Sequence, residues 1–346
     1  MNDYPLVTVG LPVYNGERFL AKTIESLLGQ DYPNVEIIIS DNASGDGTRD
    51  ICTAYASKYK QIRYLRNNIN IGPVKNSMKI LDVCPSQFVM WASDHDLWHP
   101  SYISRLMEEV VRDESVVLAY ARTVVIDVND NVVELTPDTL DTRGLNPCQR
   151  ISKIMWEFTW GNMNFGLYRT HALRKVMRDC KIISYDHVQM AVISLLGSIA
   201  QVDEPLFYRR NNRPEEDAQK KTQRHVEWFG IGGFEGVIPR ILMAYEHVAV
   251  IRESDLSEAE KEYLYAEVKR CFPARFGYEM QTEILRLITE GSKTISKSQA
   301  QPLSLFIACT EFLKLANVCR FFYSDAEQLN SFILYLENLG KVIPLK

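Results

Sequence analysis

The sequence lacks the features that mark several common classes of protein. Its 346 residues include only 17 glycines and 14 prolines, which excludes a collagen-like or low-complexity chain. Its 7 cysteines are odd in number and show no CxxC pair, so neither a disulfide framework nor a structural zinc site is predicted. With a formal net charge of -5, the basic domain typical of nucleic-acid binding is missing. We therefore expect a globular protein with free thiols and no nucleic-acid partner.

The sequence also predicts neither a signal peptide nor a membrane-spanning helix. Residues 1–17 do not combine a basic region with an apolar run, so no signal peptide is predicted. The apolar stretch 303–323 carries Glu311, Lys314 and Arg320, whereas a spanning helix needs about 20 residues nearly free of charge. We expect a cytoplasmic protein.

Common nucleotide and nucleophile motifs do not occur. The first expected strand is not followed by GxGxxG, and the chain contains no GxxxxGK[ST] and no GxSxG. Nicotinamide cofactors, P-loop chemistry and a serine nucleophile elbow are therefore disfavoured.

What the first 125 residues do contain is an alternation of two periodicities. Short apolar or β-branched segments predict strands at 6–11, 35–39, 62–65, 88–91 and 116–126, and those at 35–39 and 88–91 are expected to be buried. Segments between them have helical spacing, and short strands at 132–135, 164–169 and 201–210 follow. Strands that alternate with helices predict a Rossmann-like α/β fold with a doubly wound sheet.

The later part of the chain has a different pattern. Helical spacing dominates after residue 213, and Ser257 with Glu260 forms a capping box that opens a helix to about Phe272. Further helices are predicted at 274–290, 302–323 and 325–338. We expect two domains, an α/β domain at 1–212 and a helical domain at 213–346.

Polar residues follow four consecutive predicted strands. The segments are PVYNG at 12–16, DNASGDGT at 41–48, NNINIG at 67–72 and SDHD at 93–96. Ligands of open α/β sheets bind beyond the carboxyl ends of the strands. Turn formation alone explains any one of these loops. Clustered acids, however, repel each other unless a divalent cation or hydrogen-bond donors compensate.

These segments give the N-terminal half a resemblance to the family 2 glycosyltransferases of the GT-A fold. The resemblance covers about residues 5–212, through the segments 11–48, 68–72, 88–103, 164–175 and 195–210. It implies a mixed, mostly parallel sheet flanked by helices and followed by an all-helical region. It also implies transfer of a hexosyl or N-acetylhexosaminyl group from a nucleoside diphosphate sugar, with a lean toward UDP. The acceptor that the resemblance implies is a hydroxyl of a glycan or lipid-linked acceptor, as in bacterial surface-polysaccharide biosynthesis.

The resemblance also assigns the nucleotide site. It implies that Pro12, Tyr14 and Asp41 hold the base and ribose, and that Asn70 and Gly72 close over the nucleotide.

The acidic motif Asp94-His95-Asp96 would bind the ribose and a Mn²⁺ or Mg²⁺ ion that bridges the diphosphate. Relatives usually carry adjacent aspartates before the Leu-Trp pair, whereas this chain has His95-Asp96. Which carboxylate holds the metal is open, and His95 either joins the metal or points away from it.

The resemblance further implies that Arg209 and Arg210 lie near the diphosphate and that Asp186 is the general base. An acid before an apolar helical run is also a helix cap, which is the alternative for Asp186. One base opposite the leaving group makes a single in-line displacement, and hence inversion. A positioned base contributes roughly 10²–10⁴-fold to the rate.

Two other functions stay open. A nucleotidyltransferase-like enzyme also presents acids at strand ends, but PVYNGE lacks the Gly-rich basic loop of that class. A catalytically inactive sugar-nucleotide-binding scaffold is the second. The helical domain leaves three roles open: acceptor binding, contact with the inner face of the cell membrane, and homodimerisation.

Overall fold

The computed structural model describes residues 4–177, 185–212, 220, 238–298 and 302–342. The chain forms two compact units. The first unit is Met1–Cys180 with Gln189–Thr222, and the second is Lys181–Val188 with Gln223–Lys346. The expected domain boundary after Asn212 adjoins residues 213–219, which lie outside the described part.

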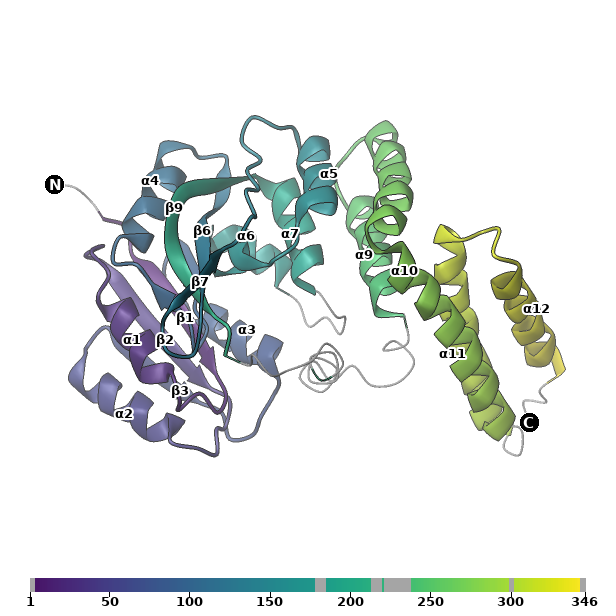
Figure 1. Ribbon diagram of the computed structural model, residues 1–346, viewed down its shortest axis with the longest axis horizontal. Coiled ribbons are helices and arrows are strands. Elements are labelled where there is room, and N and C mark those ends of the chain that lie inside the picture. The colour runs from purple at the N-terminus through teal and green to yellow at the C-terminus, as the bar shows by residue number, and fades with distance from the viewer. Residues whose placement is uncertain (1–3, 178–184, 213–219, 221–237, 299–301, 343–346) are drawn as a thin grey trace. The chain divides into compact units, whose positions relative to one another are not determined.

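The first unit begins with four parallel strands. They are β1 (Val7–Val13), β2 (Val35–Asp41), β3 (Ile62–Arg66) and β4 (Phe88–Trp91), in the spatial order β3-β2-β1-β4. Helices α1 (Leu20–Leu28) and α2 (Thr48–Lys58) lie on one face of these strands and α3 (Pro73–Val83) lies on the other (Figure 1). This is the doubly wound arrangement that the alternation of periodicities predicts.

The sheet continues beyond β4 with strands of both directions. Its order is β3-β2-β1-β4-β8-β6-β9-β5, and β7 pairs with β6. Strands β8 and β5 are antiparallel to their neighbours, whereas β6 and β9 are parallel. The added strands are β5 (Leu97–Trp98), β6 (Val116–Ile126), β7 (Val132–Leu135), β8 (Leu167–Arg169) and β9 (Ser198–Arg210). The sheet is therefore mixed, as expected for the α/β fold.

Four α-helices and a 3₁₀ helix complete the first unit among the described residues. They are α4 (Tyr102–Arg112), α5 (Pro147–Glu157), η1 (Asn162–Phe165), α6 (Thr170–Val176) and α7 (Tyr185–Leu196), whose first residues belong to the second unit. The predicted strand at 164–169 begins only at Leu167, because η1 occupies the residues before it.

Strand β1 fixes the position of the first loops. Its side chains are almost all buried, since β2 and β4 flank it and helices cover both faces. The parallel register places Val13 opposite Asp41, and Asp41 opposite Arg66. The carboxyl ends of β1, β2 and β3 are consequently level, and the loops that follow them meet at one edge.

The second unit is helical in its described part. It contains α9 (Pro239–Arg252), α10 (Glu258–Ser298), α11 (Pro302–Phe322) and α12 (Glu327–Val342). The predicted helices at 257–272 and 274–290 correspond to two helical stretches that meet at a kink inside α10, where Phe276 has a non-helical φ of -129° and ψ of 22°. Pro273 lies three residues before this kink, lacks a backbone N–H and clashes with the preceding turn, so a regular helix is interrupted in this region.

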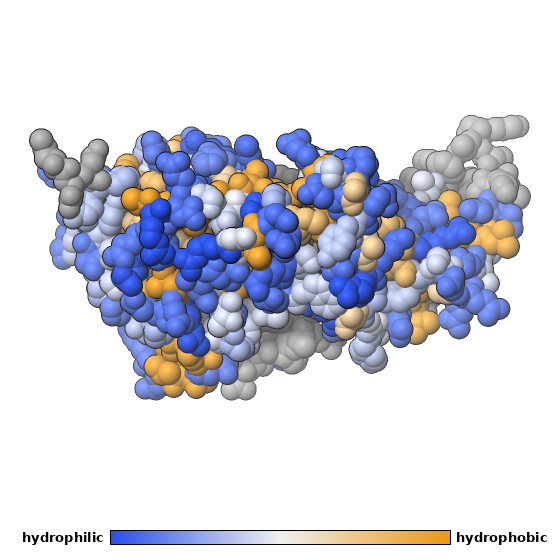
Figure 2. Space-filling model, turned by 90° about the horizontal axis from the view of Figure 1, so that it is seen from above, coloured by the Kyte–Doolittle hydropathy of each residue, from blue (hydrophilic) through white to orange (hydrophobic). Residues whose placement is uncertain are grey.

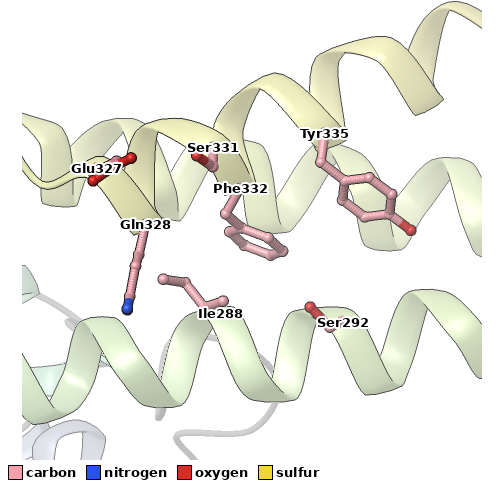
Figure 3. Close-up of a pocket in the computed structure, with 7 residues that line it drawn as sticks. All are labelled: Ile288, Ser292, Glu327, Gln328, Ser331, Phe332 and Tyr335. Atoms are coloured by element: carbon pink, nitrogen blue, oxygen red, sulfur yellow. The ribbon is translucent and has the colours of Figure 1, made fainter.

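A hollow opens between α10 and α12 in this unit. Figure 3 shows Ile288 of α10 and Phe332 of α12 pointing toward each other there, with Ser292 and Tyr335 beside them. None of the site residues expected from the sequence lines this hollow.

The described helices were compared with the length and hydropathy that a membrane-spanning helix needs. No described helix combines the length and the apolar character needed to cross a membrane. On the face drawn in Figure 2, hydrophilic residues dominate and apolar ones form small separate groups.

Candidate nucleotide-sugar site

The loops after β1 and β2 are tied together by short hydrogen bonds. The backbone N–H of Asn15 donates to Ser44 Oγ at 2.9 Å, and the N–H of Gly45 donates back to Asn15 Oδ1 at 2.9 Å. Asn15 has a φ of 54°, a left-handed conformation that asparagine tolerates better than most residues. Gly16 donates its N–H to Thr48 Oγ1 at 2.9 Å. The two loops therefore form one rigid edge.

Asp41, the last residue of β2, is the buried centre of this edge. Its side chain is 0% exposed and pairs with the Arg66 guanidinium. Tyr64 Oη donates to Asp41 Oδ2 at 2.8 Å, and the Ser44 N–H donates to Oδ1 at 2.8 Å. Burial by itself raises the pKa of Asp41, but the hydrogen bonds from Ser44, Tyr64 and Arg66 outweigh it and hold the pKa below its ordinary value. The carboxylate is thus ionised and fully engaged by the protein.

The loop after β3 is held by an asparagine network. Asn42 Nδ2 donates to Asn70 Oδ1 at 2.7 Å, and Asn67 Nδ2 donates to Asn42 Oδ1 at 3.0 Å. Asn70 Oδ1 also accepts the N–H of Gly72 at 2.9 Å. Gly72 has a φ of 86°, in the region that favours glycine. Asn70 itself is exposed, so the network presents this loop to solvent.

Pro12 and Tyr14 lie on either side of the end of β1. Pro12 is paired with Ser40 in the sheet register and is half-buried. Tyr14 is 46% exposed, a large fraction for an aromatic side chain in a closely bonded loop. The aromatic ring is therefore open to a ligand at this edge.

The acidic motif after β4 separates its two carboxylates. Asp96 is 1% exposed; its Oδ1 accepts the N–H of Arg210 at 2.7 Å, and its Oδ2 accepts the Ser93 hydroxyl. The Asp94 side chain is partly exposed and lies 2.6 Å from His95 Nδ1. A Cβ at Gly16 would lie 2.6 Å from Asp94 Oδ2, so the first loop lies against this carboxylate. Asp94 is the acid that faces the loop edge.

Metal binding has to be judged from this donor set. Within the described ranges, no group of at least three His, Cys, Asp or Glu side chains is placed to hold a metal ion. Mg²⁺ is usually bound through one or two carboxylates together with substrate phosphates, rather than by an all-protein cage. Asp94 with His95 fits that mode, because both side chains are partly exposed. Asp96 fits it poorly, because both of its oxygens already accept hydrogen bonds.

The two arginines that end β9 have different surroundings. Arg210 has a side chain that is 0% exposed and pairs with Asp130. Its Nε donates to the carbonyl of His95 at 2.8 Å, and its guanidinium lies 4.5 Å from the centre of the Phe19 ring. Arg210 thus stabilises the acidic motif from the buried side, through hydrogen bonds to Asp96 and to the His95 carbonyl.

Arg209 is turned toward another segment. Its Nη1 donates to the Trp160 carbonyl at 2.7 Å and to Asn162 Oδ1 at 2.8 Å. Arg209 therefore holds the segment around η1 rather than the acidic motif. Contact of either arginine with a diphosphate stays a prediction.

Asp186 lies in the first turn of α7, in the part of that helix that belongs to the second unit. Its Oδ1 accepts the N–H of His187 at 3.0 Å, and the residue is partly exposed. The position at a helix start is compatible with a cap. The role of Asp186 as a base stays a prediction.

Sequence reasoning missed several residues that build the edge. Tyr64, Arg66, Asn42 and Asn67 bond directly to predicted site residues or to each other. The sequence did contain a signal for the Asp41–Arg66 pair. Asp41 is the last residue of β2, and a basic residue, Arg66, is the last residue of the neighbouring strand β3.

Comparison with known proteins gives a consistent result. The model of the family described as glycosyl transferase family 2 matches residues 8–172. The β-1,3-glucosyltransferase of Campylobacter jejuni that acts on GalNAc(5)-diNAcBac-PP-undecaprenol is 32% identical over 106 residues, which are 30% of this chain and 34% of that protein. The chain spans between 26% and 42% of the length of three other curated relatives it matches.

Several solved structures resemble this chain over nearly its whole length, among them the following two. S. aureus TarS 1-349 in complex with UDP-GlcNAc has a TM-score of 0.61 at 16% identity, covering 99% of this chain and 93% of that one. The mannosyltransferase PcManGT of Pyrobaculum calidifontis, in complex with GDP-Man and Mn²⁺, has a TM-score of 0.52 at 16% identity, covering 99% and 88%. At this identity the likeness concerns the fold, and it confirms the predicted GT-A fold with a helical region after it. Through residues 8–172, the chain belongs to glycosyl transferase family 2.

Proposed function

We propose that this protein is an inverting glycosyltransferase that uses a UDP-linked hexose or N-acetylhexosamine as donor. The acceptor is a hydroxyl of a glycan or a lipid-linked glycan in bacterial polysaccharide assembly. The observation that carries the proposal is the sheet edge formed by the loops after β1, β2, β3 and β4. Tyr14, Asn70 and Asp94 are accessible to solvent there, and hydrogen bonds among the loops hold this edge together. The family membership and the UDP-GlcNAc and GDP-Man complexes of similar folds support it.

The donor nucleotide lies, in this proposal, on the loops after β1, β2 and β3. The exposed ring of Tyr14 offers a stacking surface for the base, at about 1–3 kcal/mol for a base on an aromatic ring. Asp41 acts with Arg66 and Tyr64 to hold this edge in shape, and Asn70 with Gly72 covers the nucleotide from the side of β3.

The diphosphate lies beside the acidic motif. Asp94 and His95 would hold a Mn²⁺ or Mg²⁺ ion. A divalent cation offsets the negative charge that builds on the leaving nucleoside diphosphate. Asp96 and Arg210 keep the motif in place from within the domain, and Arg209 orders the segment that begins at Trp160.

Asp186 is the general base that takes the proton of the acceptor hydroxyl as the oxygen attacks the anomeric carbon. The oxygen–carbon bond forms while the bond from that carbon to the diphosphate oxygen breaks, which inverts the anomeric configuration. Asp186 is partly exposed, so a hydroxyl has access to its carboxylate.

The helical part from residue 213 is, in our proposal, a second domain. Acceptor binding, contact with the inner face of the membrane, and dimerisation are its three candidate roles. Flotation with anionic vesicles and sedimentation velocity distinguish the second and third from the first.

The function is tested by titrating the protein with UDP in the presence and absence of Mn²⁺, and by following UDP release from a panel of UDP-sugars. We expect Mn²⁺-dependent binding that raises the melting temperature, and UDP release with at least one donor. Absence of metal-dependent binding to UDP and to GDP would contradict the proposal. Binding without any turnover would instead favour the inactive scaffold.

The role of Asp186 is tested with Asp186→Asn. We expect UDP release to fall by about 10²-fold or more while the Kd of UDP stays within about twofold. Asp203→Asn is a matched control, because Asp203 is a highly exposed carboxylate in β9 paired only at 3.3 Å with Arg122. A loss of UDP affinity in Asp186→Asn would assign the residue to structure or to the metal.

A further inference from the structure

Two histidines form a buried pair in the second unit. His187, in the first turn of α7, is 4% exposed, and His247 of α9 is 0% exposed. Their rings meet at 75°, with His187 Nδ1 at 3.0 Å from His247 Nε2. Phe272 of α10 packs on both rings, with its centre 5.6 Å and 4.8 Å away. The pair therefore joins three helices in apolar surroundings.

The chemistry of the neighbours fixes the direction of the hydrogen bond between the two rings. The Met243 carbonyl, 2.8 Å from His247 Nδ1, can only accept, so Nδ1 carries the proton. His247 Nε2 is then the acceptor in the neutral ring, and His187 Nδ1 must donate to it. His187 Nε2 is consequently an acceptor as well. It faces Arg275 Nη1, which can only donate, at 3.4 Å.

The result is a directed chain from Arg275 through His187 and His247 to Met243. Burial keeps both rings neutral, since it lowers the pKa of His187 and of His247 below the ordinary value. A neutral ring in any other tautomer would leave a buried N–H facing another N–H. A buried donor left without an acceptor is costly, so this combination of tautomers is the favoured one.

His187, a middle member of this hydrogen-bond chain, directly follows the proposed base Asp186 in the sequence. The backbone N–H of His187 donates to Asp186 Oδ1 at 3.0 Å, so the orientation of the His187 peptide sets the orientation of the Asp186 carboxylate. His187 is itself held by α9 through His247 and by α10 through Arg275. A shift of the first turn of α7 would therefore move the carboxylate with it.

We propose that His187, His247 and Arg275 are positioning residues that hold the Asp186 carboxylate in place. The inference rests on the proposed role of Asp186 as the general base. It gives the helical unit a part in the reaction, because α9 and α10 supply two of the three residues. Misplacement of a reacting group by about 1 Å can cost roughly 10²-fold in rate.

The kinetic test compares His247→Leu with His247→Gln in the full chain. Leucine removes the acceptor for His187 Nδ1, whereas the glutamine amide oxygen can reach the place of Nε2. With UDP-GlcNAc and UDP-glucose as donors, water as acceptor and Mn²⁺ present, we expect His247→Leu to lower kcat for UDP release by about 10-fold to 100-fold. The KM of the donor should stay within twofold, and His247→Gln should recover most of kcat.

A control in the same unit distinguishes a fall of kcat caused by general destabilisation from one caused by misplacement of Asp186. Phe312→Leu in α11 also removes buried volume, since Phe312 is 0% exposed and packs edge-on against Phe332. It should lower the melting temperature without changing kcat. An equal fall of kcat in Phe312→Leu, or an unchanged kcat in His247→Leu, would overturn the proposal.

Two further measurements tie the effect to Asp186. In the Asp186→Asn background, His247→Leu should cause no further loss of kcat, because residues that act through one group are not additive. Amide hydrogen exchange in residues 185–188 should accelerate in His247→Leu and not in Phe312→Leu. This exchange experiment needs no turnover: unchanged exchange refutes the positioning role, whereas absence of UDP release from every donor by the wild type refutes the proposed function.

Discussion

The two carboxylates of the acidic motif provide the sharpest prediction, because the structure gives them opposite surroundings. Asp96 is 1% exposed and accepts from the Arg210 N–H and the Ser93 hydroxyl. Asparagine at position 96 keeps one acceptor oxygen, but its NH₂ group takes the place of the second oxygen and cannot accept the hydrogen bond that this oxygen accepted. A hydrogen bond to a charged group contributes about 1.5–3 kcal/mol, so Asp96→Asn should cost about 2–3 kcal/mol of stability. For a unit of this size that is a fall in Tm of about 5–10 °C.

Asp94→Asn should behave in the opposite way. The Asp94 side chain is partly exposed and contacts the neighbouring His95, so stability should change by no more than about 0.5 kcal/mol. If Asp94 binds the ion directly, its loss should exceed the roughly 10–100-fold penalty typical of outer-shell partners. Mn²⁺-dependent binding of UDP should therefore be nearly abolished.

The assays are thermal unfolding without metal and calorimetric titration with UDP, with and without MnCl₂. Asp82→Asn serves as the control, because Asp82 is an exposed carboxylate in α3. The reasoning is refuted if Asp96→Asn unfolds at the wild-type temperature yet loses Mn²⁺-dependent UDP binding while Asp94→Asn retains it. In that case Asp96 would be the metal ligand despite its burial.

Three further changes test the fold around the two sites. Asp41→Asn should lower the stability to thermal unfolding at pH 7 by about 1.5–3 kcal/mol, because the buried carboxylate loses hydrogen bonds from Ser44, Tyr64 and Arg66. Since the folded pKa of Asp41 is lowered, this contribution should disappear as the pH falls below its ordinary value of 3.8. Gly16→Ala should weaken Mn²⁺-dependent UDP binding more than it lowers Tm, because its Cβ would lie 2.6 Å from Asp94 Oδ2, and an unchanged Kd would contradict this. Burial raises the pKa of Glu283 to about 7, so its ionised form destabilises the fold and the stability present at low pH is lost as the pH rises through 7. Glu283→Gln removes this titration, and its stability relative to the wild type should rise by up to about 3 kcal/mol between pH 5 and pH 8; a pH-independent difference would refute the assignment.

Most strands were predictable from apolar runs. Such runs located β1, β2, β4 and β6 to within a few residues, because a strand covered on both faces requires them. The edge strand β3 was located as well, although only Ile62 of its five residues is buried. The two-residue strand β5 was missed, since Leu97 and Trp98 are too few to establish a period. The interruption in α10 was located to within a few residues, because Pro273 cannot continue a regular helix.

The sequence also determined the composition of the candidate site. Polar residues after four consecutive strands indicated the edge of the sheet, and the ordered motifs indicated the family before any geometry was known. This is possible because carboxyl ends of parallel strands meet at one edge by topology alone.

Only the tertiary structure decided which of these residues are open and which are internal. Asp41 and Asp96 are both acids at strand ends in the sequence, yet both are buried and bonded, whereas Asp94 is accessible. Burial and partner choice depend on register and on residues far along the chain. Arg210 reaches Asp96 across 114 positions, and His187 reaches His247 across 60. Local periodicity carries no information about such contacts, because they exist only once the sheet and the helices have packed.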